Sequence, residues 1–317
     1  MRSLHIVYAA LFALAPCGAF AQAPVPVPPV KLSKPNGHGL KNKIAILSYS
    51  INFVTAQRAS ANATVGVKAR AGTALIGVDE AMMRRLANEA FADLKAQMAA
   101  AGIPSIGDDI VARTARTAGV TLIPGNREEN RDGGMTIGTG IKKAYVSVGA
   151  DAAPLTDLYQ SAGKVGGFGM LARFGKGNAL SKPALELGAA FISPSLTIDF
   201  ADADARIGRT LAGSRRASVE IEPQFAIRAP SPTNIQVGQS VGIAGPTMMT
   251  LSKDVVIKAP FSHSAGASAM QSEGAYLEMK QARPGDIIVD LPRWTALVQS
   301  AYRAYNASVV ANLLAAR

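Results

Sequence analysis

The sequence predicts a protein of the α/β or α+β class, in which an N-terminal strand-helix-strand unit precedes an antiparallel sheet and a packed C-terminal helix. The prediction rests on a buried-strand pattern at 43–47 followed by a long amphipathic helix, on two amphipathic strands at 191–201 and 218–228, and on an apolar helical stripe after Pro292. The chain has 317 residues, 48% of them hydrophobic, which is enough to bury a core.

The first 21 residues are typical of an export signal. Arg2 supplies a positive charge, residues 6–16 form a short apolar run, and Ala19-Phe20-Ala21 is a small-x-small cleavage site. The run is too short to span a bilayer, so we expect cleavage after residue 21 and a location in the periplasm or at the outer-membrane periphery. The single cysteine, Cys17, lies inside this segment, and the proline before it favours simple cleavage over lipidation. The mature chain is therefore expected to form no disulfide.

The remaining chain is predicted to consist of a proline-rich tether at 22–42 and a single body at 43–317. The tether begins QAPVPVPPV, and so many prolines exclude a helix or a central strand. The body is divided into an α/β half at 43–162 and a glycine-rich basic segment at 163–177. Antiparallel strands at 178–290 and a final helix at 291–317 complete it.

The N-terminal half is expected to begin with the strand at 43–47. Tyr49, Ile51 and Phe53 continue its period of two but out of step, which indicates a bulge or bend within one long strand. The small and alanine-rich residues 56–74 are interpreted as an extended excursion or a mobile loop.

Asp79 is the predicted N-cap of a helix that ends before Gly102. Its apolar residues recur at helical spacing, which is typical of core packing. A shorter helix at 108–118 and a strand at 120–123 are expected after it. A surface loop at 124–140, a second strand at 141–149 and a short helix at 155–162 are expected to follow.

The second half changes to strict alternation of apolar and polar residues. The strands at 191–201 and 218–228 are joined by a charged connection at 202–216, and further strands are expected near 235–243 and 254–258. Such alternation favours an antiparallel meander with one solvated face. The final helix is expected to pack on this sheet.

Carboxylates and histidines give no recognisable catalytic or metal-binding pattern. Glu220 and Glu222 share one strand face and are interpreted as solvent-facing positions, and the aspartates at 199, 202 and 204 lack the order of a calcium-binding loop and are interpreted as a turn. His263 lies among small residues without a nucleophile motif. We therefore expect no enzyme, no cofactor and no metal. The net charge of +11 comes in scattered pairs and the aromatic content is 6%, which argues against nucleic-acid binding.

The most unusual segment is 163–177, GKVGGFGMLARFGKG. It combines glycines, apolar side chains and three cations without an acid, and its spacing is wrong for a phosphate-binding loop. An interfacial loop or a membrane-inserting hairpin formed after assembly fits this composition, as does a disordered surface loop. The candidate partner contacts are Lys164, Phe168, Arg173, Phe174 and Lys176.

The order of these features resembles the periplasmic α/β domain of curli-secretion-channel (CsgG-like) lipoproteins. The resemblance rests on the strand at 43–47, the long helix ending at Ala101-Gly102 and its following strand, and on the segment 163–177 before strands 191–201 and 218–228. It implies an outer-membrane-associated oligomer that exports or anchors surface fibres. The sequence differs from that family in having no acceptable lipidation motif, and charges line one face of the two strands.

Taken together, these features predict a non-catalytic, secreted envelope-associated binding or assembly protein. The expected partners are an envelope protein or an anionic envelope polymer, with association of several copies at the outer membrane left open. Two alternatives also remain at this point. One is a periplasmic hydrolase that acts on envelope polymer and uses His263 or Glu220, and the other is a carrier of an apolar ligand.

Overall fold

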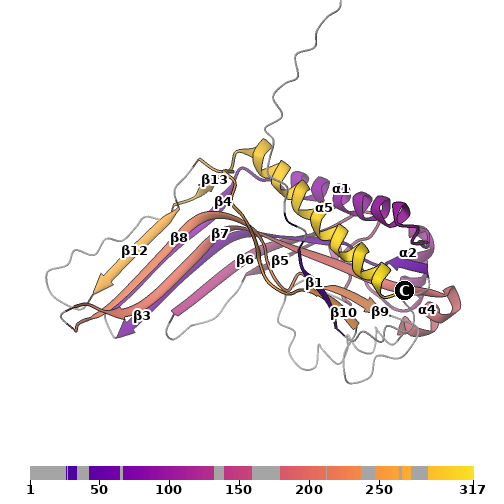
Figure 1. Ribbon diagram of the computed structural model, residues 1–317, viewed down its shortest axis with the longest axis horizontal. Helices are drawn as coiled ribbons and strands as arrows, with labels where there is room; N and C mark the ends of the chain where they lie inside the picture. The colour runs from indigo at the N-terminus through magenta and orange to yellow at the C-terminus, as the bar shows by residue number, and fades with distance from the viewer. Residues whose placement is uncertain are drawn as a thin grey trace, which may run out of the picture.

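A long mixed β-sheet runs through the molecule, and helices cover only one end of it (Figure 1). The structure is a computed structural model that describes residues 26, 28–33, 43–64, 67–131, 139–158, 179–211, 213–236, 247–263, 266–272 and 285–317. Within these residues the fold is of the α/β class, as predicted, and the C-terminal helix packs on the sheet.

The helices are α1 (Glu80–Ala100), α2 (Asp108–Thr117), α4 (Ser181–Leu187) and α5 (Leu291–Ala315), with a 3-10 turn at Pro124–Asn126. The strands of the first half are β1 (Val30–Ser33), β2 (Lys43–Ile46), β3 (Ser50–Thr64), β4 (Val67–Ile76), β5 (Arg127–Arg131) and β6 (Thr139–Gly149). Those of the second half are β7 (Ala189–Arg209), β8 (Arg215–Ile227), β9 (Thr233–Gln236), β10 (Thr247–Leu251), β11 (Val255–Ile257), β12 (Ala267–Ser272) and β13 (Ile287–Ile288).

Strand β7 connects the two halves of the sheet. It runs parallel to β2 and β3 and antiparallel to β8 and β9. Strand β3 in turn pairs antiparallel with β4 and β6. Two long hairpins, β3–β4 and β7–β8, therefore leave the same part of the sheet side by side (Figure 1).

Both faces of the sheet are covered at the helical end. Ile44 and Ile46 of β2 belong to the main hydrophobic core, whereas Ala45 and its neighbour Leu47 belong to a second cluster with residues of α2 and α4. Successive side chains of a strand point to opposite faces, so this alternation places the two clusters on the two sides of the sheet.

Helices α1 and α5 lie together over the main core (Figure 1). The rings of Phe53 and Trp294 are 5.8 Å apart, and the Tyr49 hydroxyl donates to Asn306 Oδ1 at 2.9 Å. The Asn306 amide donates to the carbonyl of Ala90, which ties α5 to α1. Burial is the main cause that raises the pKa of Tyr49 well above its ordinary value, so this hydroxyl stays protonated as a donor.

The predicted ends of α1 are confirmed. The Asp79 carboxylate accepts a hydrogen bond from the Met82 N–H at 2.7 Å, as an N-cap residue does. Gly102 has a φ of 67°, a left-handed conformation that glycine adopts without a steric cost. Helices α2 and α5 are also found close to their predicted positions.

Of the two alternatives given for 56–74, the mobile loop is wrong, because the described residues of this range are extended and form most of the β3–β4 hairpin. The prediction of one long strand with a bulge or bend near Tyr49 is also wrong, because the structure has two separate strands there. The chain breaks between β2 and β3, and this break explains why the apolar residues on either side are out of step.

Four further expectations in the first half are corrected. Residues 120–123 form only an isolated bridge from Leu122 to Thr156, and 155–158 are not helical. Part of the predicted loop at 124–140 is strand β5, paired with β6. Val30–Ser33, inside the predicted tether, form the edge strand β1, which is antiparallel to β10.

The two strands predicted for the second half exist, but they are longer than expected. Residues 202–209 continue β7, and β8 begins at Arg215, so most of the predicted connection at 202–216 is paired strand. The aspartates at 202 and 204 therefore lie in a ladder, and the turn predicted for them is wrong. Strands β9 and β11 confirm parts of the remaining two predicted strands, and residues 237–246 lie outside the described part of the chain.

Candidate functional site

The strands that project beyond the helices form the most distinctive surface of the protein (Figure 1). We call this part the strand extension, and it comprises residues 57–64, 67–73, 139–143, 201–209 and 215–223 together with β12. One layer contains β6, β3 and β4, and the other contains β7, β8 and β12. Cα atoms of β4 and β8 lie within 8 Å of one another, so the two layers are in contact.

Small side chains allow this close approach. On the first hairpin, alternate residues are buried, and they include Ala59, Ala61, Val67, Ala69 and Ala71. On the second hairpin the buried residues are Ala201, Ala217, Val219 and Ile221, and all of these side chains belong to the same core cluster. Packed sheets usually lie about 10 Å apart, and alanine-rich faces can approach more closely.

A buried charged network holds the extension where it leaves the body. Asp199 of β7 is fully buried, and its Oδ2 accepts from Arg228 Nε at 2.7 Å and from Lys143 Nζ at 2.5 Å. Its Oδ1 accepts from Gln57 Nε2 at 2.5 Å and from the Phe200 N–H at 2.8 Å. Hydrogen bonds to the ionised form and paired cations compensate for the burial of this carboxylate.

The outer end of the network is closed by Asp254. Its Oδ2 lies 2.7 Å from Arg228 Nη1, and its Oδ1 accepts from the Ala229 N–H at 2.7 Å. Desolvation alone raises the pKa of Asp254, but the Ala229 N–H and the Arg228 guanidinium outweigh it and hold that pKa below its ordinary value. Desolvation likewise opposes the charge of Arg228, while Asp199 and Asp254 together raise its pKa.

This network coincides with an irregularity in the sheet. The pairing of β7 with β8 shifts register between Asp199 and Ala201, and the Gln57 side chain donates to the Ala201 carbonyl at 2.8 Å. One amide side chain thus contacts both residues that flank the shift. A bulge of this kind bends a strand, and here the bend is fixed by buried ionic contacts.

The outward side chains of the β3–β4–β6 layer are basic. Arg58 lies directly opposite Lys142, while Arg70 lies opposite Ser60 and Lys68 opposite Asn62. The three residues on β3 and β4 are exposed, and Lys142 is half-buried. We call these four cations the basic face.

Near the body, the outward side chains of the β7–β8 layer carry the opposite charge, while Arg216 lies farther out on the same side. Asp202 lies directly opposite Glu222, and Asp204 lies directly opposite Glu220. The prediction that Glu220 and Glu222 face solvent is confirmed. We call these four carboxylates the acidic face. Arg206 lies farther out on the same side and pairs with Asp204, and this contact is the main cause that raises the pKa of Arg206.

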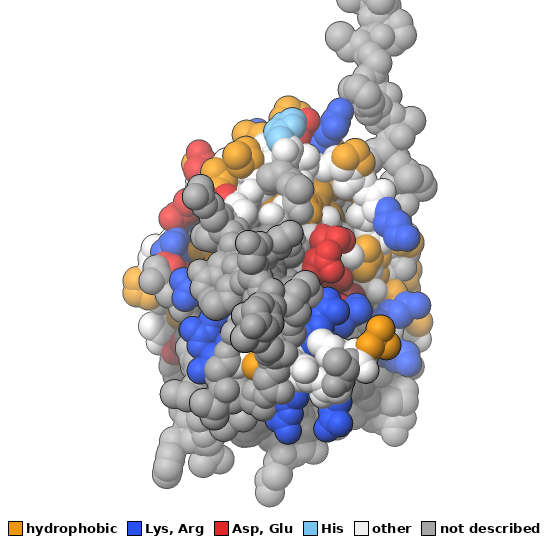
Figure 2. Space-filling view, turned by 90° about the vertical axis from the view of Figure 1, so that its left-hand side faces the viewer, with side chains coloured by type: hydrophobic (Ala, Val, Ile, Leu, Met, Phe, Trp, Pro, Cys, Tyr) orange, Lys and Arg blue, Asp and Glu red, His pale blue; other side chains and the backbone are white. Residues whose placement is uncertain are grey.

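Figure 2 views the molecule from the end of the extension. Lysine and arginine side chains are prominent in its lower half, and acidic side chains are seen mainly in the upper half, where further cations lie among them. The outward charges of the two hairpins have opposite sign only in the part of the arm nearer to the body. Farther out, the second hairpin also carries exposed cations, at Arg206, Arg209, Arg215 and Arg216.

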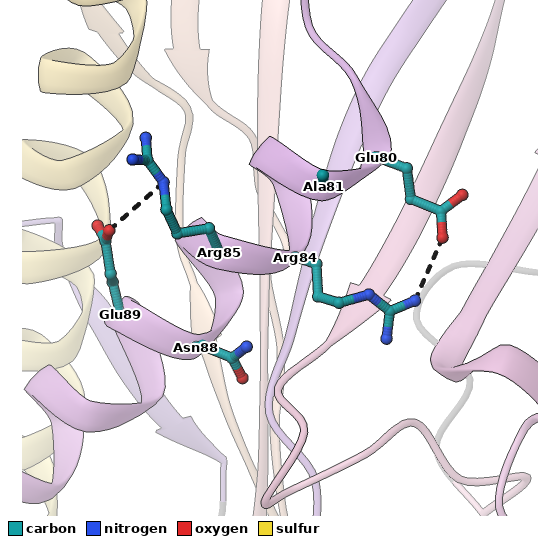
Figure 3. A pocket seen from close by; sticks show the side chains of 6 residues that line it. All are labelled: Glu80, Ala81, Arg84, Arg85, Asn88 and Glu89. Carbon is teal, nitrogen blue, oxygen red and sulfur yellow. Dashed lines mark hydrogen bonds and ion pairs between the residues drawn. The ribbon is translucent and has the colours of Figure 1, made fainter.

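A depression of about 560 Å³ lies at the start of α1 (Figure 3). All the side chains lining it come from this one helix, and they pair with one another, Arg84 with Glu80 at 3.2 Å and Arg85 with Glu89 at 3.7 Å. Small-molecule sites usually combine apolar walls with a few convergent polar groups. This depression is open and is lined by one helix only, and its cations are paired with the carboxylates beside them.

The sequence-predicted contacts Lys164, Phe168, Arg173, Phe174 and Lys176 lie outside the described residues. His263 is exposed in the loop after β11, where its N–H donates to the Ile288 carbonyl at 2.9 Å, and Glu220 lies on the acidic face. Among the described residues, no group of three His, Cys, Asp or Glu side chains is arranged to hold a metal ion.

Sequence reasoning missed the basic face because 56–74 was interpreted as an extended excursion or a mobile loop, without paired strands. A period-two signal was present there, since alanines at 59, 61, 69 and 71 alternate with cations and small polar residues. Alanine had to be counted as an inward-facing residue for the strand pattern to emerge.

The comparisons with known proteins add no relative. No protein-family model, curated protein or solved structure compared with the chain matches it. In the described part of the chain, none of the helices combines the length and apolar character needed to cross a membrane.

Proposed function

We propose that this protein is an exported, non-catalytic assembly protein of the cell envelope that acts through its strand extension. The observation that carries the proposal is a two-layer arm that projects beyond the helix-covered body and presents one basic and one acidic outer face. Charged complementary surfaces steer association and fix its register, which is what an assembly protein requires.

The construction of the arm supports this role. Its layers pack through small buried side chains, and the network around Asp199 fixes its connection to the body. A rigid arm loses little conformational freedom on binding, and preorganisation of this kind favours affinity.

The resemblance to curli-secretion-channel lipoproteins adds a more specific form of the proposal. It points to an oligomer associated with the outer membrane that exports or anchors surface structures. The export signal at residues 1–21 agrees with this location.

Processing and location test the proposal. The chain with its native N-terminus is expressed in a Gram-negative host, and the intact mass of the product is measured in each cell fraction. We expect a mass that lacks residues 1–21, in the periplasmic or outer-membrane fraction. A control variant with Ala19→Arg and Ala21→Arg should retain the segment. A wild-type product that keeps all 317 residues and stays in the cytoplasm would contradict the proposal.

A further inference from the structure

We propose that the partner of the strand extension is a second copy of this chain, whose acidic face docks on the basic face of the first. This inference rests on the proposed assembly function and names its partner. It follows from the charges that the two hairpins carry on their outer sides and from the level at which those charges lie.

Each face places like charges next to one another. Arg58 stands directly opposite Lys142 on the basic face, and on the acidic face Asp202 stands opposite Glu222. Directly opposed side chains have Cβ atoms about 4.5–5.5 Å apart, and like charges at that distance are destabilising. A single contact between the two faces would relieve the repulsion on both.

Three of the four charges of the basic face are available to a partner. Within the described residues, Arg58, Arg70 and Lys142 form no ion pair. On the acidic face, Asp202 approaches Arg228 only at 3.8 Å, and its side chain is 56% exposed. Glu220 and Glu222 are exposed as well.

The two faces also lie at the same level along the arm. Gln57 contacts Asp199 and the carbonyl of Ala201, which sets the first hairpin in step with the second. Counting outward from that contact, Arg58 follows Gln57 as Asp202 follows Ala201. Two arms that lie side by side in the same direction would therefore bring Arg58 and Arg70 to the level of the carboxylates without a shift along the arm. Only Lys68, farther out, lies at the level of Arg206.

The contact is heterologous, because one copy supplies the acidic face and its neighbour supplies the basic face. Each copy keeps one unused face, so association continues beyond a dimer unless the array closes on itself. The contact is also expected to weaken as salt concentration rises, since exposed charges are screened.

Charge exchange between two variants provides the test. One variant carries Asp204→Lys and Glu220→Lys, and the other carries Arg58→Glu and Lys142→Glu. Each replaces a directly opposed like-charge pair with a pair of the other sign, and the first also removes the carboxylate that pairs with Arg206. Sedimentation velocity of the purified full chain is measured at several concentrations for each variant alone and for an equimolar mixture.

The wild type is expected to self-associate. Each variant alone should associate at least about tenfold more weakly, because like charges then meet across the contact. The mixture should regain association, since each variant supplies the face that the other has lost. Misfolding of a variant cannot produce such rescue. Matched controls make the same change in net charge on exposed pairs of α2 and α4, by Asp109→Lys with Glu186→Lys and by Arg113→Glu with Lys182→Glu.

Three results would overturn the proposal: a monomeric wild type at every concentration, variants that associate as the wild type does, or a mixture without rescue. Binding of a soluble polyanion that is lost only with Arg58→Glu and Lys142→Glu, together with a monomeric wild type, would assign the basic face to an envelope polymer instead. Because the experiment uses purified protein, failure here leaves the export result intact, and failure of export leaves this result intact.

Discussion

Asp199 is the residue on which the geometry of the extension depends. It is fully buried, it accepts from Arg228, Lys143 and Gln57, and it lies where the pairing of β7 and β8 changes register. Among the described residues, its carboxylate alone pairs with both cations, while Asp254 pairs with Arg228. Position and charge are therefore both needed at this point of the strand.

We predict that Asp199→Asn destabilises the fold by about 3–5 kcal/mol, because removing one partner of a buried ion pair leaves uncompensated charge behind. Urea denaturation followed by circular dichroism measures the change in the free energy of unfolding. The comparison variant is Glu222→Gln on the exposed acidic face, which should stay within about 0.5 kcal/mol of wild type. Equal stabilities for the two variants would show that the network is dispensable.

For single residues, the sequence predicted exposure correctly where the alternation within one strand determines which way a side chain faces. The alternation around Glu220 and Glu222 indicated solvent-facing positions, and the structure confirms them. The burial of Asp199 could not be predicted, because its partners are distant in the sequence. Gln57 lies on β3, Lys143 lies on β6, and Arg228 directly follows β8. Without those contacts, three aspartates within six residues are more typical of a turn.

The β3–β4 hairpin is the element that gives the arm its second layer. Its alternate alanines face β8 and belong to the common core, while residues such as Arg70 face outward. Alanine has low strand propensity, so neither strand is specified locally. Pairing with β6 and packing on the second hairpin determine the structure here, which is why the sequence alone did not predict two paired strands.

We expect Ala69→Leu to destabilise the protein by about 1–3 kcal/mol, since a larger side chain has to enter a closely packed layer. The adjacent Arg70→Leu places the same side chain on the outer face and should change stability by at most about 0.5 kcal/mol. Chemical denaturation of both variants measures the difference. If both substitutions are equally tolerated, the layers do not pack in solution as described.

Helices were predicted better than strands because their signals are local. Asp79 and Gly102 mark the ends of α1 within one stretch of chain, and the structure confirms both. Residues 120–123 have the apolar composition of a strand but form a single bridge, since Val120 packs with α2 in the second cluster instead. Composition alone does not decide whether such a run finds a pairing partner.

At the scale of the whole molecule, the separation of charge exists only after folding. The cations of the basic face lie on both strands of the first hairpin, β3 and β4, and on β6, which begins more than sixty residues after the end of β4. The carboxylates of the acidic face lie on β7 and β8, in the second half of the chain. A net charge of +11 suggests a uniformly basic protein, yet the arm has an acidic side. This polarity makes a second copy the natural partner.

Cross-linking between copies tests that claim most directly. In a Cys17→Ser background, copies carrying Arg70→Cys are mixed with copies carrying Glu220→Cys and treated with a short bis-maleimide linker. The account predicts a covalent dimer in the mixture, much less with either variant alone, and none above background when Lys182→Cys on α4 replaces one partner. A mixture that cross-links no better than the Lys182→Cys control would contradict the docking of the acidic face on the basic face.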